Sequence, residues 1–177
     1  MKYINNIEKK MYLALLQAQK GLELNEVPIG AIIIKDEKVI GKGYNQTQQL
    51  QDPTAHAEII AITSAANTLK SWRLIDCEIY VTKEPCSMCA GAILNSKIKS
   101  LYFGAYDEKE GCCGSLYQLC HDPRFKHQST VSGGILEFDC QKILKDFVSK
   151  NRLNYTYSQV LEFVNTIPGE CVGDDVM

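Results

Sequence analysis

No stretch of this 177-residue sequence is apolar over the roughly 20 residues that a membrane-spanning helix requires. The first ten residues are polar and charged, and they contain no apolar core of a signal peptide. We therefore expect a protein that has no membrane segment and remains in the cytoplasm. Because thiols stay reduced in that compartment, the eight cysteines are expected to be free rather than paired in disulfides.

Lysine and arginine are absent after Arg152, whereas acidic residues continue toward the end of the chain. Residues 1–152 contain all 19 basic residues and 17 of the 21 acidic ones, a net charge of +2. This weak balance gives no strong electrostatic footprint of nucleic-acid binding, although it leaves room for a local phosphate-binding patch, and no DNA partner is expected. Internal repeats and low-complexity linkers are also missing. We expect one domain over residues 1–152, followed by a C-terminal helical extension and acidic tail over residues 153–177.

Apolar periodicity predicts helices alternating with strands. Helices are expected over residues 5–20, 55–66, 86–95 and 141–152, the first ending at Gly21. Strands are expected over residues 29–34, 39–44, 77–82 and 99–104. The first two strands flank a short charged turn and should form an antiparallel hairpin, whereas the last two are joined through a helix and should run parallel. The expected fold is α/β, a three-layer α/β/α sandwich with a mixed central sheet.

The stretch from 107 to 128 mixes glycine, proline and charge, which is typical of a loop, here with one short helix. Its expected inward-facing side chains are Leu116, Leu119 and Cys120. Residues 134–138 form either a short strand or the approach to the last helix, and residues 157–164 continue a helical spacing. The last helix should turn inward the side chains of Ile143, Leu144, Phe147 and Val148. Cys77 and Cys140 lie in apolar patterns and are expected in the core.

The pattern His56-Ala57-Glu58, followed downstream by Pro85-Cys86-Ser87-Met88-Cys89, carries the chemistry. One imidazole and two thiolates are good Zn²⁺ ligands, and three protein ligands leave a fourth tetrahedral position for water. Zinc lowers the pKa of its bound water to about 7, which provides a hydroxide nucleophile at neutral pH. Glu58 is not needed as a ligand and can carry protons. This H-x-E…P-C-x-x-C spacing is the signature of zinc nucleobase deaminases.

The spacing suggests how local structure would assemble the site. Pro85 suits a helix start, and the positive end of that helix favours thiolate over thiol at the cysteines. Thr54 is expected to cap the preceding helix, which would place His56 and Glu58 in its first turn. Two helix N-termini would then meet at one cation.

Two other interpretations of the cysteines remain open. A C-x-x-C pair can be a redox pair or half of a structural zinc site. A structural site would need a fourth protein ligand. The candidates for this fourth ligand are His121, His127, Cys112, Cys113 and Cys120. Neither interpretation explains Glu58, which favours the catalytic one.

From Glu26 to Arg152 the chain resembles the bacterial tRNA adenosine deaminases, a family with the cytidine deaminase fold. The matching segments are Glu26-Val27-Pro28-Ile29-Gly30-Ala31, Asp52-Pro53-Thr54-Ala55-His56-Ala57-Glu58, Arg73-Leu74-Ile75-Asp76, Glu84-Pro85-Cys86-Ser87-Met88-Cys89-Ala90-Gly91-Ala92-Ile93, Phe103-Gly104-Ala105 with Asp107, Gly114-Ser115-Leu116, His127 and Gly134-Ile135-Leu136. The chain departs from the family pattern at Tyr106, at Cys112-Cys113, at Lys126 and in its acidic tail.

The resemblance implies an activity and a role for particular residues. The family converts the wobble adenosine of a tRNA anticodon loop to inosine and works as a homodimer. The implied roles are zinc ligation by His56, Cys86 and Cys89, proton transfer by Glu58, a hydrogen bond from Asn45 to the extruded nucleoside, and a position for Asp107 near the target ribose, where a 2′-hydroxyl can be read.

Two alternatives for the function stay open at this point. One is a deaminase of free guanine, cytosine or adenosine, because the zinc motif alone serves all of these substrates. The other is a non-catalytic, zinc-stabilised RNA-binding module. A binding module has no use for a proton shuttle, so Glu58 favours an enzyme.

Overall fold

The computed structural model describes residues 5–153. Its centre is a five-stranded sheet in the order β2-β1-β3-β4-β5. The strands are β1 (Gly30–Lys35), β2 (Lys38–Tyr44), β3 (Glu78–Lys83), β4 (Ser100–Ala105) and β5 (Thr130–Ser132). Strand β1 runs antiparallel to both β2 and β3, whereas β3, β4 and β5 are parallel. The mixed α/β sheet predicted from the sequence is confirmed.

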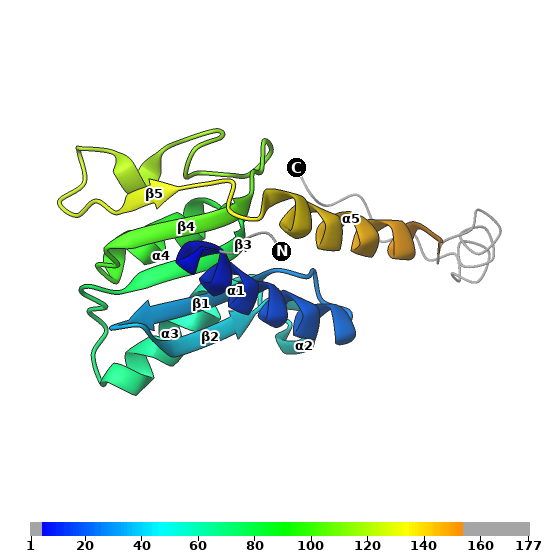
Figure 1. Ribbon diagram of the computed structural model, residues 1–177, viewed down its shortest axis with the longest axis horizontal. Helices are drawn as coiled ribbons and strands as arrows, with labels where there is room; N and C mark the ends of the chain where they lie inside the picture. The colour runs from blue at the N-terminus through cyan, green and yellow to red at the C-terminus, as the bar shows by residue number, and fades with distance from the viewer. Residues whose placement is uncertain (1–4, 154–177) are drawn as a thin grey trace, which may run out of the picture.

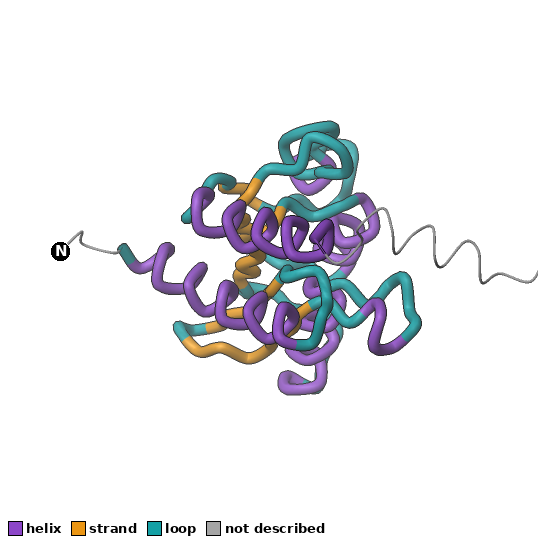
Figure 2. Tube along the Cα trace, turned by 90° about the vertical axis from the view of Figure 1, so that its right-hand side faces the viewer, coloured by secondary structure: helices purple, strands orange, loops and turns teal. Residues whose placement is uncertain are grey.

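Helices cover both faces of this sheet (Figure 1). They are α1 (Asn6–Glu23), α2 (Thr47–Leu50), α3 (Ala57–Leu69), α4 (Ser87–Asn95) and α5 (Glu137–Leu153), with a single 3₁₀ turn η1 (Leu119–His121). Helices α1 and α5 lie on one face, and α3 and α4 lie on the other. Figure 2, turned by 90°, shows helices on both sides of the strands. Among the helices of residues 5–153, none combines the length and the apolar composition that a membrane crossing requires.

The alternation of side chains along β3 divides the core in two. Ile79 and Val81 face α3 and α4 and belong to the larger cluster, which also includes Cys77. Tyr80 faces the other way, into a smaller cluster with Cys140 of α5, and stacks on Tyr102 with ring centroids 4.6 Å apart. Cys77 and Cys140 are fully buried, as the sequence predicted.

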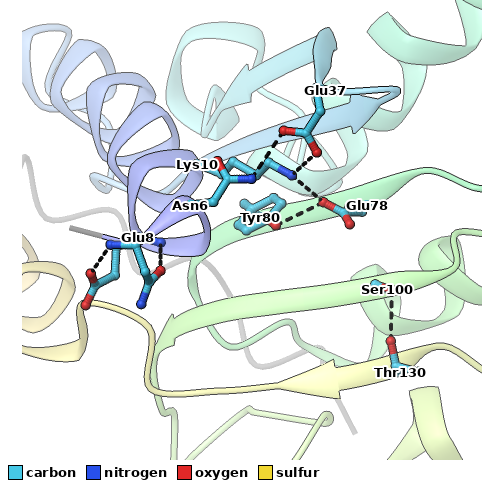
Figure 3. Close-up of polar contacts among 9 residues, drawn as sticks. Asn6, Glu8, Lys10, Glu37, Glu78, Tyr80, Ser100 and Thr130 are labelled. Atoms are coloured by element: carbon cyan, nitrogen blue, oxygen red, sulfur yellow. Dashed lines mark hydrogen bonds and ion pairs between the residues drawn. The ribbon is translucent and has the colours of Figure 1, made fainter. Parts of the chain in front are cut away.

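Polar contacts fix α1 on the sheet (Figure 3). The buried Lys10 donates to Glu37 Oε1 at 2.9 Å and to Glu78 Oε2 at 3.1 Å. Tyr80 Oη donates to the same Glu78 oxygen at 3.0 Å. One ammonium group therefore connects α1 to the turn of the β1–β2 hairpin and to β3. A capping box of Asn5 and Glu8 satisfies the first turn of α1.

Several boundaries and side-chain orientations predicted from the sequence are wrong. Helix α1 does not end at Gly21 but continues to Glu23, with Gly21 packed inside against Tyr44. Leu116 is 50% exposed and Val148 is 47% exposed, whereas Leu119 and Cys120 do pack inward. The last strand lies at 130–132, residues 134–136 lead into α5, which begins at Glu137, and the short helix α2 has no counterpart among the predicted elements.

The predicted extension and tail, residues 153–177, and the helical spacing at 157–164 within it, fall outside the described residues except for Leu153. The domain boundary therefore stays a prediction.

Close packing of β2 on α3 depends on glycine. A Cβ atom at Gly43 would overlap the carbonyl oxygen of Ala57 and lie 2.7 Å from the backbone nitrogen of Ala61. Gly41 meets the same helix one turn further along, where an added Cβ would lie 2.8 Å from the backbone nitrogen of Ala65. Both obstacles include backbone atoms, which cannot move aside without shifting the helix. The absence of side chains at Gly41 and Gly43 thus lets α3 pack directly against β2.

We expect Gly43→Ala to lower the free energy of unfolding by about 1–3 kcal/mol, because the added methyl group must push α3 away from the sheet. The matched control is Gly21→Ala, where the nearest heavy atom to the new Cβ would be 3.6 Å away and helix propensity improves. Urea denaturation measures both variants. Equal stability of the two would contradict this account of the packing.

Candidate active site and metal centre

The N-termini of helices α3 and α4 lie next to each other. His56 is the N-cap of α3 and Cys86 is the N-cap of α4, both with extended backbone angles. Neither side chain caps its own helix, so both are free to face another group. The predicted cap Thr54 is wrong, because its hydroxyl and its backbone nitrogen both donate to Asp52 Oδ1 at 2.7 Å. The positive ends of both helices lie at this site, as expected.

The ligand atoms of His56, Cys86 and Cys89 all lie within 4.8 Å of one another. His56 Nδ1 is 3.7 Å from Cys86 Sγ and 3.6 Å from Cys89 Sγ. Tetrahedral zinc with Zn–N of about 2.0–2.1 Å and Zn–S of about 2.3 Å requires an N···S separation of about 3.6 Å. The three donors are therefore already spaced for one metal ion, and their chemistry fits it.

The two thiols differ in protonation. A hydrogen bond from the Cys89 thiol, supported by His56, lowers the pKa of Cys86 to about 3 despite partial burial. The same hydrogen bond, together with burial, raises the pKa of Cys89. The interaction with Cys86 also raises the pKa of His56 against the effect of burial. A metal cation binds thiolates and neutral imidazole, so it would replace the protons that these groups share.

Glu58 lies in the first turn of α3, one residue beyond Ala57, and its side chain is only 4% exposed. Burial is the largest influence on this carboxyl group and raises its pKa. A carboxyl group whose pKa is raised above its usual value binds a proton more readily, which suits a group that accepts a proton and returns it. Within residues 5–153 it is not part of the three-residue ligand cluster, which agrees with a role in proton transfer.

The cluster opens into a pocket of about 240 Å³. His56, Cys86 and Glu58 form one wall, and Asn45 lies beside them. Asn45 Oδ1 accepts a hydrogen bond of 2.9 Å from the backbone nitrogen of Ala57, the first residue of α3. The acceptor end of the amide is thereby used, so the Nδ2 group is the donor that Asn45 can offer to a ligand. The pocket is smaller than the roughly 300–1,000 Å³ of sites for drug-sized ligands.

A second, larger hollow of about 560 Å³ lies between α1 and α5. It is lined by apolar side chains such as Leu16 and Ile143 and by polar ones such as Gln19 and Asp146, and it includes none of the three candidate metal donors. Size alone therefore does not identify the site. The smaller pocket is the one where titratable groups with shifted pKa values and metal ligands converge.

Glu84 organises the loop on one side of the pocket, a role that the sequence interpretation missed. Its buried carboxylate accepts hydrogen bonds from the backbone nitrogens of Asp107, Cys113 and Ser115 at 2.9–3.0 Å. The Ser115 hydroxyl donates to it as well. The one signal in the sequence is its position directly before Pro85-Cys86, at the end of a buried strand. Glu84 ties the loop of residues 107–115 to the strand that leads into the metal ligands.

Glu26 plays the same role for the segment that contains α2, from which Thr47 lines the pocket. It is 1% exposed and accepts hydrogen bonds from the backbone nitrogens of Gln48 and Gln49 at 3.2 and 2.7 Å. These are nitrogens at the start of α2, which has no cap of its own from Gln46. In the sequence, Glu26 stands out only as part of a matching segment. Two buried carboxylates thus hold the two loops that flank the pocket.

Asp107 lines the pocket together with Lys83. Its Oδ2 lies 2.6 Å from Lys83 Nζ, and its Oδ1 accepts a hydrogen bond from the backbone nitrogen of Lys109. Burial would raise the pKa of Asp107, but these hydrogen bonds and the charge of Lys83 lower it. Both side chains line the pocket. No pattern in the sequence indicates this ion pair.

The candidate fourth ligands are occupied elsewhere in the part of the chain that the structure describes. The Cys113 thiol donates to Cys120 Sγ at 3.6 Å, and Cys112 Sγ donates to the Glu110 carbonyl at 3.4 Å. His127 Nε2 lies 2.8 Å from the carbonyl oxygen of Ile98. Neither these groups nor His121 joins the ligand cluster within residues 5–153. The arrangement does not support a closed four-ligand structural site.

The sequence is similar to known deaminases over most of its length. The family model of MafB19-like deaminases matches residues 5–152. A Haemophilus influenzae tRNA-specific adenosine deaminase is 44% identical over 146 residues, which is 82% of this chain and 84% of that protein. A Bacillus subtilis tRNA-specific adenosine deaminase is 41% identical, over 82% of this chain and 90% of its own.

Two solved structures of deaminases are also similar to this chain. One comes from work on A-to-I editing by tRNA:A34 deaminases at the wobble position of transfer RNA. It has a TM-score of 0.74 and 42% identity, and the match covers 77% of this chain and 99% of that one. Guanine deaminase from Bacillus subtilis has a TM-score of 0.55 and 38% identity over 58% of this chain and 66% of its own.

We expect Cys89→Ala and His56→Ala to lose most of their bound divalent metal, because either change leaves only two of the three donors. Glu58→Gln should keep a full metal content, since its carboxylate is outside the ligand cluster. Cys113→Ala is the matched thiol control and should also keep its metal. Plasma mass spectrometry of the purified proteins measures metal per chain. A Cys89→Ala protein that binds metal as well as Cys113→Ala would remove Cys89 from the site.

Proposed function

Because the chain belongs to the family of tRNA-specific adenosine deaminases, we propose that it removes the amino group of the wobble adenosine of a tRNA by hydrolysis. Adenosine and water give inosine and ammonia. One observation assigns this function to particular residues. The cluster of three metal donors borders a pocket, and Glu58 lines the same pocket.

We further propose that the metal is zinc, held by His56 Nδ1, Cys86 Sγ and Cys89 Sγ. When bound, zinc supplies Lewis acidity that makes a water molecule nucleophilic at neutral pH. The thiolate of Cys86 is favoured by its neighbours before any metal arrives. The fold itself brings the three donors within 4.8 Å of one another, which supports a site organised largely by the protein.

Glu58 is the proton carrier of the reaction. Its carboxylate takes a proton from the attacking water and delivers it to N1 of the adenine ring. It then delivers the second proton to the exocyclic nitrogen, which leaves as ammonia. Burial supports this role, because a raised pKa helps the carboxylate to accept the proton that it then returns.

Asn45 and Asp107 hold the substrate. The Nδ2 group of Asn45 would donate a hydrogen bond to the extruded nucleoside, with the opposite end of the amide fixed on α3. Asp107, which also lines the pocket, would accept from the 2′-hydroxyl of the ribose. The backbone hydrogen bonds that Glu26 and Glu84 accept keep both loops in place before the base arrives.

The partner that fits this site is a tRNA anticodon loop, whose bases are single-stranded and can be extruded. We also propose a cytoplasmic homodimer. An exposed apolar surface supports the dimer: Trp72 is 60% exposed and lies at a hollow between α3 and α4 with Ile62 and Ala92. Sedimentation equilibrium at micromolar concentration tests the dimer, and a mass of one chain would contradict it.

The decisive assay offers the zinc-loaded protein an anticodon stem-loop, free adenosine, guanine and cytosine, and measures ammonia release together with inosine in the RNA. We expect inosine at the wobble position and little reaction with the free bases or nucleoside. Glu58→Gln should retain its zinc but slow turnover by about 10²–10⁴-fold, the usual contribution of a general acid–base group.

Two results would overturn the proposal. Rapid deamination of guanine without inosine in the stem-loop would make the chain a free-base deaminase. Stem-loop binding without release of ammonia from any of the four compounds would make it a binding module.

A further inference from the structure

The pocket is strongly acidic for a site that receives RNA. Four carboxylates line it, from Glu58, Glu84, Asp107 and Glu110. Among the described residues that line the pocket, Lys83 is the single lysine or arginine. Glu58 and Glu84 are buried, so the charge that an approaching phosphate meets is mainly that of Asp107 and Glu110. Without Lys83 this entrance would repel a polyanion.

The position of Lys83 follows from the sheet. It is the last residue of β3, on the same face as Ile79 and Val81, and its Cα partner in β4 is Ala105. Asp107 follows Ala105 by two residues, so the parallel register of β3 and β4 brings the two charges together. Ligand sites of α/β proteins form at this carboxyl end of the strands.

The ion pair holds Lys83 without using up its donors. Its Nζ lies 2.6 Å from Asp107 Oδ2, and the side chains are 27% and 12% exposed. An ammonium group has three N–H donors, and this contact occupies one of them. Asp107 is itself fixed by Lys109 N and by Glu84, which accepts from its backbone nitrogen. The ammonium group is thus held at the entrance of the pocket with donors to spare.

We propose that Lys83, held by Asp107, is a phosphate-binding subsite for the backbone of the RNA next to the target nucleotide. This inference rests on the proposed function and extends it from the base to the flanking phosphodiester. The pocket accepts the neutral base and ribose, and Lys83 neutralises the phosphate that must come close to Asp107 when they enter. A free base or nucleoside carries no phosphate, so Lys83 contributes to the preference for RNA over those compounds.

The test compares deamination of the stem-loop by wild type, Lys83→Met and Lys83→Arg at several salt concentrations between about 50 and 200 mM. A hydrogen bond to a charged group typically contributes enough for about a tenfold effect. We therefore expect Lys83→Met to raise KM for the stem-loop by about tenfold with little change in kcat. The dependence of log(1/KM) on log salt should flatten by about 0.7, the share of one phosphate contact with a single strand. Lys83→Arg should restore both values.

Lys38→Met is the matched control. It removes the same charge from an exposed position at the start of β2, the end of that strand distant from Asn45, and should leave KM and the salt dependence unchanged. Zinc content and thermal stability are measured for every variant. If Lys83→Met loses either, Lys83→Gln takes its place, because an amide can still donate to Asp107 without carrying the charge.

An unchanged salt dependence and an unchanged KM in a zinc-loaded Lys83→Met protein would overturn the phosphate subsite but not the proposed function. Lys83 would then only form its ion pair with Asp107. A wild-type protein that neither binds nor deaminates the stem-loop would overturn the proposed function and the phosphate subsite together.

Discussion

The meeting of two helix starts is the constraint on which the rest of the site depends. His56 and Cys86 occupy the N-caps of α3 and α4, and their side chains turn toward each other instead of capping their own helices. The resulting separations of 3.6–3.7 Å from His56 Nδ1 to the two sulfurs match one tetrahedral ion. The two glycines of β2, Gly41 and Gly43, let α3 lie close to the sheet. This contact helps to set the positions of His56 and Glu58 at the start of α3.

Buried carboxylates hold the loops beside the candidate metal site in place. Glu26 and Glu84 each accept several backbone hydrogen bonds, so the loops beside the pocket are held by fully satisfied polar groups. Such networks rigidify a structure when every member has its partners. The ion pair of Lys83 and Asp107 adds an organised cation at the entrance. Rigidity before binding suits an enzyme that must receive a base extruded from its stack.

Much of the fold and the ligand set could be predicted from the sequence because the signals are local. The apolar runs predict the hairpin and the parallel strands, and H-x-E…P-C-x-x-C predicts the three donors that the structure brings together. The pair of Lys83 and Asp107 could not be predicted, since it depends on the register between β3 and β4. Helix α2 depends on Glu26, which is more than 20 residues away in sequence. The predicted cap of α3 is misplaced because Thr54 finds a nearer acceptor in Asp52.

The most direct test of the central claim is X-ray absorption at the zinc edge on the purified protein. The account predicts two sulfur neighbours at about 2.3 Å, from Cys86 and Cys89, and nitrogen or oxygen neighbours at about 2.0–2.1 Å, from His56 and a water. In this coordination the water occupies the one position that no protein ligand fills. Three or four sulfur neighbours, with the additional one or two supplied by Cys112, Cys113 or Cys120, would mean a closed structural site and would contradict the account.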